Sequence, residues 1–368
     1  MATELRQGDF EAFFAAPFAV YGRGTPYVSP MKSDLRRFLD NGNPFFSKGN
    51  GALDFWTAHR DGRVLGRITA HEHGAANTAF ATRRGYFGYL DVPDDAAAAG
   101  ALLARAEAWC RARGLTEISG NFDLTAMQQI GVVTDGYAHA PYTDLVWSPP
   151  WLPGHLEANG YARSFGMTTF EVDLTTAQAP ELKPKSQAIL DDPDFAFAPI
   201  SRATIPQRME EARVILNASF AKNPMFVPVS AEEFHFQAKD MKWVMDPRIS
   251  AVLHHRGEPV ACIICIPDLN PFLKRTGSRM GVTTPWHFVR HRMRNRRAVL
   301  IFSGVVPEWQ GRGVNPVVLR RVILAAQNAG YVRLGNTWIG DANGASLAQK
   351  AKAGARPLHR LHLFSKDL

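Results

Sequence analysis

The sequence has few cysteines and no long apolar run, and each absence excludes a class of protein. Its three cysteines, Cys110, Cys262 and Cys265, are too few for a disulfide framework and lack the four-ligand grouping of a structural zinc site, so no metal is expected. Cys262 and Cys265 are spaced as CxxC within an apolar run, where strand alternation points them to opposite faces of a sheet. Buried packing is therefore the favoured interpretation of both side chains.

No stretch reaches the roughly 18 apolar residues that a bilayer-spanning helix needs, and the N-terminus is charged where a signal peptide needs an apolar core. These absences predict a cytoplasmic protein, and they leave peripheral attachment to the inner membrane open. The length favours two domains, because 368 residues exceed the usual size of a single hydrophobic core.

Acidic residues are absent from residues 269–297. The number of lysines and arginines in this segment equals the formal net charge of the whole chain, +8. They are Lys274, Arg275, Arg279, Arg290, Arg292, Arg294, Arg296 and Arg297. Apolar residues such as Trp286 and Phe288 lie between them, a mixture typical of an amphipathic element on an anionic surface. A solvated basic loop, a membrane-surface or lipid-substrate element and a nucleic-acid contact are the three interpretations, of which the last is the least favoured.

The chain also contains an internal repeat. Residues 58–68 match 253–263, residues 101–114 match 317–330, and residues 159–163 match 353–357. The first pair has the turn chemistry of a β-hairpin, and the second has helical spacing that ends at a glycine. The two segments of the second pair lie about twenty residues farther apart in the chain than those of the other two pairs. An insertion in the second half, namely the basic segment, explains the difference. Each half is thus predicted to be a hairpin, a central strand, a helix and a closing strand–helix–strand unit.

A glycine-containing loop follows the central strand of the second half. From Val305 to Asn315 the sequence reads ValValProGluTrpGlnGlyArgGlyValAsn and leads into a helix. Gly311 and Gly313 let successive backbone N–H groups turn toward an anion, and the N-terminus of the helix adds a partial positive charge. Pro316 is compatible with the first helical turn, since its position has no intrahelical N–H bond to lose. The pattern predicts a phosphate-binding loop.

The corresponding loop of the first half lacks glycine. It reads AspAspAlaAlaAlaAla from Asp94 to Ala99 and is about two residues shorter by this alignment. Two carboxylates there would repel a pyrophosphate. The first half is therefore predicted to be a degenerate copy that supports its partner instead of binding an anion.

The loop of the second half resembles the acyl-CoA pyrophosphate loop of the GNAT acyltransferase superfamily, and the resemblance extends over nearly the whole chain. It implies an α/β fold of the α+β type, with two tandem GNAT-like domains over residues 1–180 and 181–368, each a mixed twisted sheet flanked by helices. It also implies an acyl-CoA co-substrate, held by backbone N–H groups and admitted by a splayed strand pair. The implied cofactor-binding residues are Val305, Val306, Gln310, Gly311, Arg312, Gly313, Val314, Asn315 and Asn343. Many members have a tyrosine general acid on the last helix, where this chain has Lys350.

The reaction that the resemblance implies is attack of an amine on a thioester through a tetrahedral oxyanion. A base or a water chain has to take the proton of the amine, and candidates lie near the ends of the central strands. The candidate catalytic residues are Asp268, Asn270, Trp338 and Asp341. A turn-forming role for Asp268 and a helix-capping role for Asp341 are the structural alternatives.

A more specific resemblance is to the bacterial ceramide synthases, on short motifs spread over the full chain. The motifs lie at residues 43–46, 88–95, 134–137, 226–229, 266–270 and 338–343. The resemblance implies transfer of a long-chain acyl group from acyl-CoA to the amine of a sphingoid base of the 3-oxo type, forming a ceramide precursor. Residues 120–131 depart from the usual stretch of that group and are expected to line the acceptor side. An anionic membrane surface contacting residues 269–297 would suit such a lipid.

Two other functions stand as alternatives. An aminoacyl-tRNA-dependent or small-amine transferase could be built on the same fold, and in the first case the basic segment would grip RNA. A non-catalytic CoA-binding protein would use the loop for binding and transfer nothing.

Overall fold

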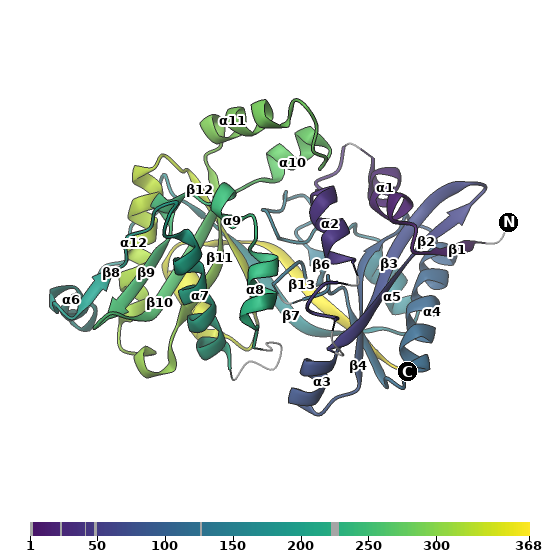
Figure 1. The fold of residues 1–368 in the computed structure, drawn as a ribbon, viewed down its shortest axis with the longest axis horizontal. Helices are drawn as coiled ribbons and strands as arrows, with labels where there is room; N and C mark the ends of the chain where they lie inside the picture. The colour runs from purple at the N-terminus through teal and green to yellow at the C-terminus, as the bar shows by residue number, and fades with distance from the viewer. Residues whose placement is uncertain (1–2, 23, 41, 48–49, 126, 222–227) are drawn as a thin grey trace.

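The computed structural model describes residues 3–22, 24–40, 42–47, 50–125, 127–221 and 228–368, so two residues of the motif at 226–229 lie outside the described part. One mixed sheet runs through the molecule in the order β1-β2-β3-β4-β5-β13-β7-β12-β11-β10-β9-β8, and β6 pairs with β13. Figure 1 shows the two halves side by side, with β7 and β13 running between them. A mixed twisted sheet flanked by helices is the predicted fold class, which is confirmed.

The strands of the first half are β1 (Glu4–Gln7), β2 (Gly51–Arg60), β3 (Arg63–His73), β4 (Arg84–Asp91), β5 (Glu117–Gly120), β6 (Val132–Asp135) and β7 (Ala162–Asp173). Its helices are α1 (Phe10–Tyr21), α2 (Lys32–Phe38), α3 (Gly74–Phe80), α4 (Ala96–Ala112) and α5 (Leu152–Ala158). The strands of the second half are β8 (Phe195–Phe197), β9 (Ala251–His255), β10 (Glu258–Pro267), β11 (Arg297–Val305), β12 (Arg333–Gly340) and β13 (Arg356–Asp367). Its helices are α6 (Pro184–Asp191), α7 (Ile205–Phe220), α8 (Ala231–Gln237), α9 (Met241–Val244), α10 (Asn270–Thr276), α11 (Thr284–Arg294), α12 (Val314–Asn328) and α13 (Gly344–Lys352), with short 3-10 turns at Pro247–Ile249 and Pro307–Trp309.

The three matching registers correspond to matching elements. β2 and β3 form an antiparallel hairpin, and so do β9 and β10. Both hairpins turn through an Asp-Gly or Arg-Gly pair with positive φ at both residues, Asp61-Gly62 and Arg256-Gly257, which is the twist that two-residue hairpin turns require. Helices α4 and α12 are each followed by a glycine with positive φ, Gly114 and Gly330, as helix C-caps prefer. The predicted repeat is confirmed at the level of these elements.

The last strand of each half lies in the sheet of the other half. β7 ends the first half along the chain and pairs antiparallel with β12. β13 ends the second half and pairs antiparallel with β5. β7 and β13 also pair with each other over most of their length. The hydrogen-bonded sheet is therefore continuous across both halves, and the domain boundary at residues 180 and 181 stays a prediction.

Separate clusters of buried side chains pack each half and their junction. One cluster surrounds α4 and another surrounds α12, while a third contains residues from both halves, among them Phe13, Leu145 and Ile215. Cys262 packs in the junction cluster and Cys265 in the α12 cluster, so the two cysteines lie on opposite faces of β10. The predicted buried packing of the CxxC pair is confirmed.

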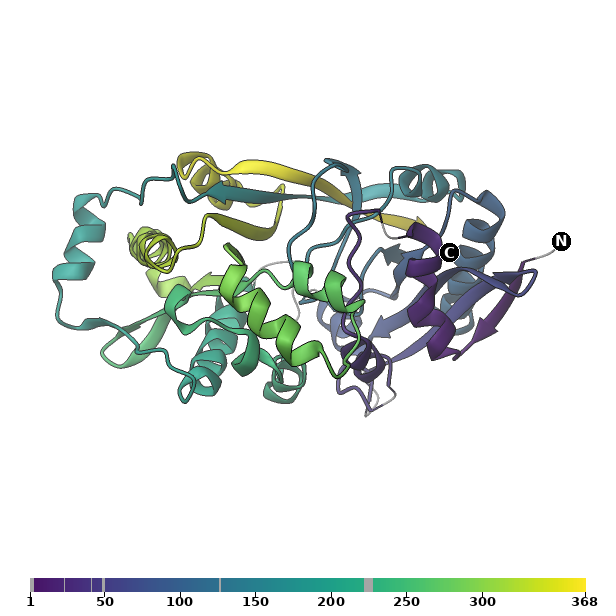
Figure 2. The same ribbon diagram turned by 90° about the horizontal axis from the view of Figure 1, so that it is seen from above.

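The basic segment is a pair of helices inserted between β10 and β11. α10 and α11 lie on one side of the molecule above the junction of the halves (Figures 1 and 2). The equivalent connection of the first half, between β3 and β4, holds only the short helix α3. The predicted insertion of the second copy is therefore present as folded structure.

Candidate functional site

A large groove lies between the two halves. Its volume is about 1430 Å³, above the roughly 300–1,000 Å³ of typical small-ligand sites. The first half contributes residues from α2, β4 and the segments around 127 and 144, and the second half contributes α7, α10, α11, β11 and β12. Large apolar side chains make up much of the wall, including Leu145, Leu216, Phe234, Met241, Phe272 and Phe288. The groove therefore suits a long, largely apolar molecule.

Strands β11 and β12 separate at the wall of this groove. They pair in parallel only from Arg297–Arg333 to Leu300–Asn336, although β11 continues to Val305 and β12 to Gly340. A bulge at Ile301 interrupts the pairing of β11 with β10. It comes directly after Leu300, the last residue of β11 that pairs with β12. Bulges bend a strand and often end its pairing beside a site. Residues 299–305 line the groove along the opened edge, as the predicted splayed strand pair requires.

The predicted phosphate loop is part of the groove wall. Gly311 and Gly313 both have positive φ, +73° and +93°. Gly313 is the N-cap of α12, and none of the side chains that the structure describes caps that helix, so its first N–H groups remain open toward an anion. A Cβ atom at Gly313 would lie 2.8 Å from the Ser186 hydroxyl, too close for a side chain. The loop thus has the glycine geometry and the open helix end that an anion cradle needs.

Helix α6 supports the loop from outside. The Ser186 hydroxyl donates to the Gly313 carbonyl at 2.9 Å, and Lys185 Nζ donates to the Gly311 carbonyl at 3.0 Å. Lys185 also lines the groove, which adds a positive charge beside the loop. Sequence reasoning did not include Lys185, because it lies on a separate helix about 125 residues before the loop and no motif links the two.

The corresponding helix of the first half is closed by its own side chains. The Asp95 carboxylate caps α4 by accepting from the Ala98 N–H at 2.9 Å, and its other oxygen accepts from Arg60 at 2.6 Å. The helix cap Asp95 lies two residues after Pro93 in the first half, whereas the helix cap Gly313 lies six residues after Pro307 in the second half. The first loop is therefore four residues shorter, and the sequence alignment underestimated the difference. A carboxylate already occupies the position in front of α4.

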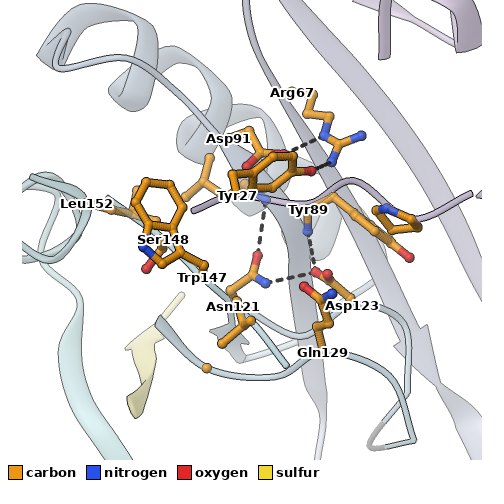
Figure 3. Close-up of a pocket in the computed structure, with 14 residues that line it drawn as sticks. Tyr27, Arg67, Tyr89, Asp91, Asn121, Asp123, Gln129, Trp147, Ser148 and Leu152 are labelled. Atoms are coloured by element: carbon orange, nitrogen blue, oxygen red, sulfur yellow. Dashed lines mark hydrogen bonds and ion pairs between the residues drawn. The ribbon is translucent and has the colours of Figure 1, made fainter. Parts of the chain in front are cut away.

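The first half also fills the opened edge of its central strand. β4 pairs with β5 only from Arg84 to Tyr86, which is the same early separation as in the second half. The Asp123 carboxylate accepts from the Tyr89 N–H at 2.7 Å, and the Asn121 side-chain oxygen accepts from the Leu90 N–H at 3.1 Å. Figure 3 shows Asn121 and Asp123 bonded to each other beside this strand, with Arg67 bonded to Asp91 and Tyr27 above them. A chain of buried polar side chains thus takes the strand N–H groups that a ligand would need.

A half-buried amine lies where the groove meets the vertex of the splayed strands. Lys350 lines the groove from α13, and its Nζ donates to the Asn336 side-chain oxygen at 2.8 Å. Asn336 is the last residue of β12 that pairs with β11. Burial lowers the pKa of Lys350 to about 8. An amine with this pKa exists in both protonation states near neutral pH, as a group that moves protons requires.

Comparisons with curated proteins and with solved structures agree with this geometry. No family model matches the chain. The chain is 25% identical to Protein YghO of Escherichia coli (strain K12), covering 100% of this chain and 95% of the relative. It is 23% identical to bacterial ceramide synthase of Caulobacter vibrioides, covering 98% of this chain and 95% of the relative.

Among solved structures, the chain superposes on the tandem GNAT protein from the clavulanic acid biosynthesis pathway with a TM-score of 0.58 at 14% identity, over 99% of this chain and 98% of the other. A GNAT N-acetyltransferase from Sphaerobacter thermophilus gives a TM-score of 0.55 at 13% identity, over 99% and 95%. Full-length coverage by both decides the architecture. The chain has the tandem GNAT fold. The resemblance to bacterial ceramide synthase stands with it, at sequence level and over nearly the whole length.

Most of the residues predicted to bind the co-substrate line the groove of this tandem GNAT fold. They are Val305, Gln310, Gly311, Gly313, Val314, Asn315 and Asn343. Val306 and Arg312 are not among the lining residues. The Val306 N–H donates to Val260 within the sheet, and the Arg312 side chain stacks on Trp309 at the surface. The role of the whole set in binding stays a prediction.

Two of the predicted catalytic residues, Asp268 and Asn270, form hydrogen bonds to the 141–143 segment of the first half and do not line the groove. One oxygen of Asp268 accepts from the N–H and hydroxyl of Thr143 at 3.1 and 3.0 Å, and the other pairs with Arg297 at 3.2 Å. The Asn270 side chain donates to the Pro141 carbonyl at 2.9 Å. Asp268 also accepts from the Asn270 N–H, the turn-forming role that was its structural alternative. The catalytic assignment of both residues stays untested.

The segment bonded by Asp268 and Asn270 leads into a carboxylate that the sequence did not indicate as a site residue. Asp144 follows Thr143, has a left-handed φ of +61°, and lines the groove. Within the described residues its carboxylate has no hydrogen-bond or ion-pair partner. The side chain is exposed to the groove, where partial loss of water contact raises the pKa of Asp144 to about 6, and the charge of Asp34 adds to the shift. Its left-handed backbone conformation is the feature that marks it in the structure. No sequence motif indicates that conformation, so the sequence alone contains no signal for Asp144.

The other two predicted catalytic residues differ in placement. Trp338 lines the groove on β12 and packs edge-on against Phe165. Asp341 is not a lining residue, and both of its oxygens accept from Arg360. Asn343 caps α13 by accepting from the Ser346 N–H at 3.1 Å, so the capping role proposed as the alternative for Asp341 belongs to Asn343. The catalytic role of Trp338 and Asp341 stays a prediction.

Among the described residues, no group of three or more His, Cys, Asp or Glu side chains is arranged to hold a metal ion. Within the same ranges, no helix has the length and apolar character needed to cross a bilayer.

Proposed function

We propose that this chain is an acyl-CoA-dependent N-acyltransferase that moves a long-chain acyl group to the amine of a sphingoid base of the 3-oxo type. The single observation that carries the proposal is the large, mainly apolar groove that runs from the glycine loop of the second half into the first half. A small soluble amine would need only a fraction of this volume. The similarity to bacterial ceramide synthase supports the same acceptor. An anionic membrane surface is the proposed source of that lipid.

The second half supplies the donor side of the proposed site. Free N–H groups at the start of α12 and the Lys185 ammonium would hold the diphosphate, and the opened edge of β11 would receive the pantetheine arm. The Val305 carbonyl is already fixed by Ser219 and Gln310, both at 2.9 Å, which makes this strand edge rigid. The thioester would then reach the vertex near Asn336 and Lys350.

The first half supplies the acceptor side. Asp144 would pair with the ammonium form of the incoming base, since a cation relieves the repulsion between Asp144 and Asp34. Met127, Gln128 and Gln129 line the same side, in the stretch expected to contact the acceptor. Asp268 and Asn270 act through the 141–144 segment as positioning residues for Asp144.

Lys350 would serve the chemical step as a proton carrier. The acceptor, bound as its ammonium form, first gives up one proton to bulk water. Its neutral amine then attacks the thioester carbon, an N–C bond forms, and the carbonyl electrons move to oxygen. When the adduct collapses, the C–S bond breaks and the electron pair leaves with sulfur. The neutral Lys350 amine takes the second proton from nitrogen and returns it to the departing thiolate, so the only proton released overall is the one that the ammonium form gave up before attack. The products are the amide and CoA with its thiol.

Incubation with palmitoyl-CoA and 3-ketosphinganine, read by mass spectrometry, tests the proposed function. We expect the N-acyl product and an equal amount of free CoA. Acylation of small soluble amines with no amide on any long-chain base would favour the small-amine alternative, and product that requires charged tRNA would favour the tRNA-dependent one. CoA binding without any transfer would leave a non-catalytic binding protein.

Asp144→Asn is expected to raise KM for the sphingoid base by roughly ten- to a hundredfold while changing KM for acyl-CoA by less than about twofold, because only the acceptor ammonium loses its partner. Steady-state kinetics with each substrate varied in turn measures the split. Asp194→Asn is the matched control, since its carboxylate is held by Arg256 and it does not line the groove. Equal effects of the two substitutions would contradict the acceptor role of Asp144.

A further inference from the structure

We infer that α10 and α11 dock on an anionic lipid bilayer and form the port through which the lipid acceptor enters the groove. The docking stands on the surface of the two helices alone. The port rests on the proposed function, because it assigns the entering molecule to the acceptor of that reaction.

Helix α11 has two apolar faces where an ordinary surface helix has one. Phe288 and His291 pack against Phe272 of α10, with ring centroids 5.5 and 6.0 Å apart. Trp286, Val289 and Met293 follow at helical spacing i, i+3 and i+7 on the opposite face. Their side chains are 59%, 56% and 81% exposed. The outer stripe therefore has no cover within the described part of the chain.

Exposed apolar side chains concentrate in this one place. Of the eleven large apolar residues that are exposed in the described ranges, five lie between Met280 and Met293. Val282, in the turn before α11, is 101% exposed and marks the end of the stripe. Contiguous apolar surface of this kind marks a binding surface, whereas single exposed apolar residues need no explanation.

Positive charge flanks the outer stripe. Arg292 and Arg294 lie on either side of it around the helix, Arg296 follows the helix end, and all three are exposed. Within the described residues none of these arginines has an ion-pair partner. Since the segment holds no acid, its charge is complementary to anionic lipid headgroups while the stripe enters the acyl boundary.

The inner side of the same helices forms part of the groove wall. Leu273 and Phe272 of α10 and Pro285 and Phe288 of α11 line it. A lipid leaving a bilayer beneath the outer stripe would therefore pass the edge of α11 and meet apolar wall at once. Nucleic acid fits this surface less well, because Val282, Val289 and Met293 have no flat face on which a base could stack.

Vesicle flotation with the full chain tests the docking. We expect binding to vesicles of phosphatidylcholine mixed with phosphatidylglycerol and little binding to phosphatidylcholine alone. The triple variant W286S/V289S/M293S should bind at least about tenfold more weakly, because it removes the three exposed apolar side chains that would enter the bilayer. The variant R292E/R294E/R296E should lose on the order of a hundredfold or more, and added salt should weaken the wild type.

The control variant is V214S/L324S, which removes two exposed apolar side chains from other helices and should bind like the wild type. Unchanged binding of the W286S/V289S/M293S variant would overturn the inference, and so would retention on tRNA without vesicle binding. Activity toward a water-soluble short-chain base should be the same in the W286S/V289S/M293S variant and the wild type. Vesicle binding without any amide product would refute the proposed function and the port but leave the docking intact.

Discussion

Gly313→Val is expected to weaken CoA binding at least about a hundredfold. The position has a φ of +93°, which a β-branched residue does not tolerate, and the new side chain would meet Ser186 and Lys185. The loop would turn away and lose the N–H groups that meet the diphosphate. Loss of two charge-assisted hydrogen bonds costs about 3 kcal/mol or more, which is roughly a hundredfold in affinity. Equilibrium dialysis with labelled CoA measures it.

Two controls separate loss of the cradle from general damage. Gly330→Val places the same residue at a positive φ of +85° after the other end of the same helix, where no atom lies within 4 Å of the new Cβ. It should keep CoA affinity within about twofold despite similar backbone strain. Asp95→Ala removes the cap of the twin helix and should lower the free energy of unfolding by about 1 kcal/mol without altering CoA affinity. A hundredfold loss in either control would contradict the assignment of the site to the second loop.

Lys350→Met is expected to lower kcat by about 10²- to 10⁴-fold, because the proton of the attacking amine loses its carrier. KM for acyl-CoA should change little, since the loop and the strand edge remain. In the wild type the rate should fall as the pH drops below about 8, because Lys350 then becomes protonated and cannot accept a proton. A pH–rate profile of both proteins checks this, and the fall near pH 8 should disappear from the residual activity of the variant.

Lys350→Arg distinguishes a proton carrier from a structural cation. Arginine keeps the positive charge and can still donate to Asn336, but it does not release a proton in this pH range. It should be as inactive as the methionine variant. Near-normal activity of the arginine variant would assign Lys350 a purely structural role.

The elements that local chemistry determines could be predicted from the sequence. The hairpin turns at Asp61-Gly62 and Arg256-Gly257, the C-cap glycines and the loop from Gln310 to Asn315 each carry their signal in adjacent residues. The insertion at residues 269–297 was found because the repeat around it fixed the register. These features need only the preference of a residue for a backbone conformation or a helical period.

The remaining features depend on contacts that the sequence does not encode locally. The exchange of β7 and β13 was not predictable, because the sheet that a closing strand joins is decided by pairing with residues far away in the sequence. Asp268 lies at a strand end, where a catalytic group is expected, but one of its oxygens holds Thr143 and the other pairs with Arg297. The carboxylate that lines the groove belongs to Asp144, the residue after Thr143. Lys185 meets the loop only through the packing of α6 on α12.

The central claim is that the loop of the second half binds the diphosphate of CoA. The first half does not, because Asp95 caps the matching helix and Asn121 and Asp123 take the N–H groups of the matching strand edge. Isothermal titration of the wild-type chain with CoA tests it most directly, because the stoichiometry counts the sites. The account predicts one CoA per chain and no measurable heat with the Gly313→Val variant. Two CoA per chain, none, or an unchanged titration of that variant would contradict it.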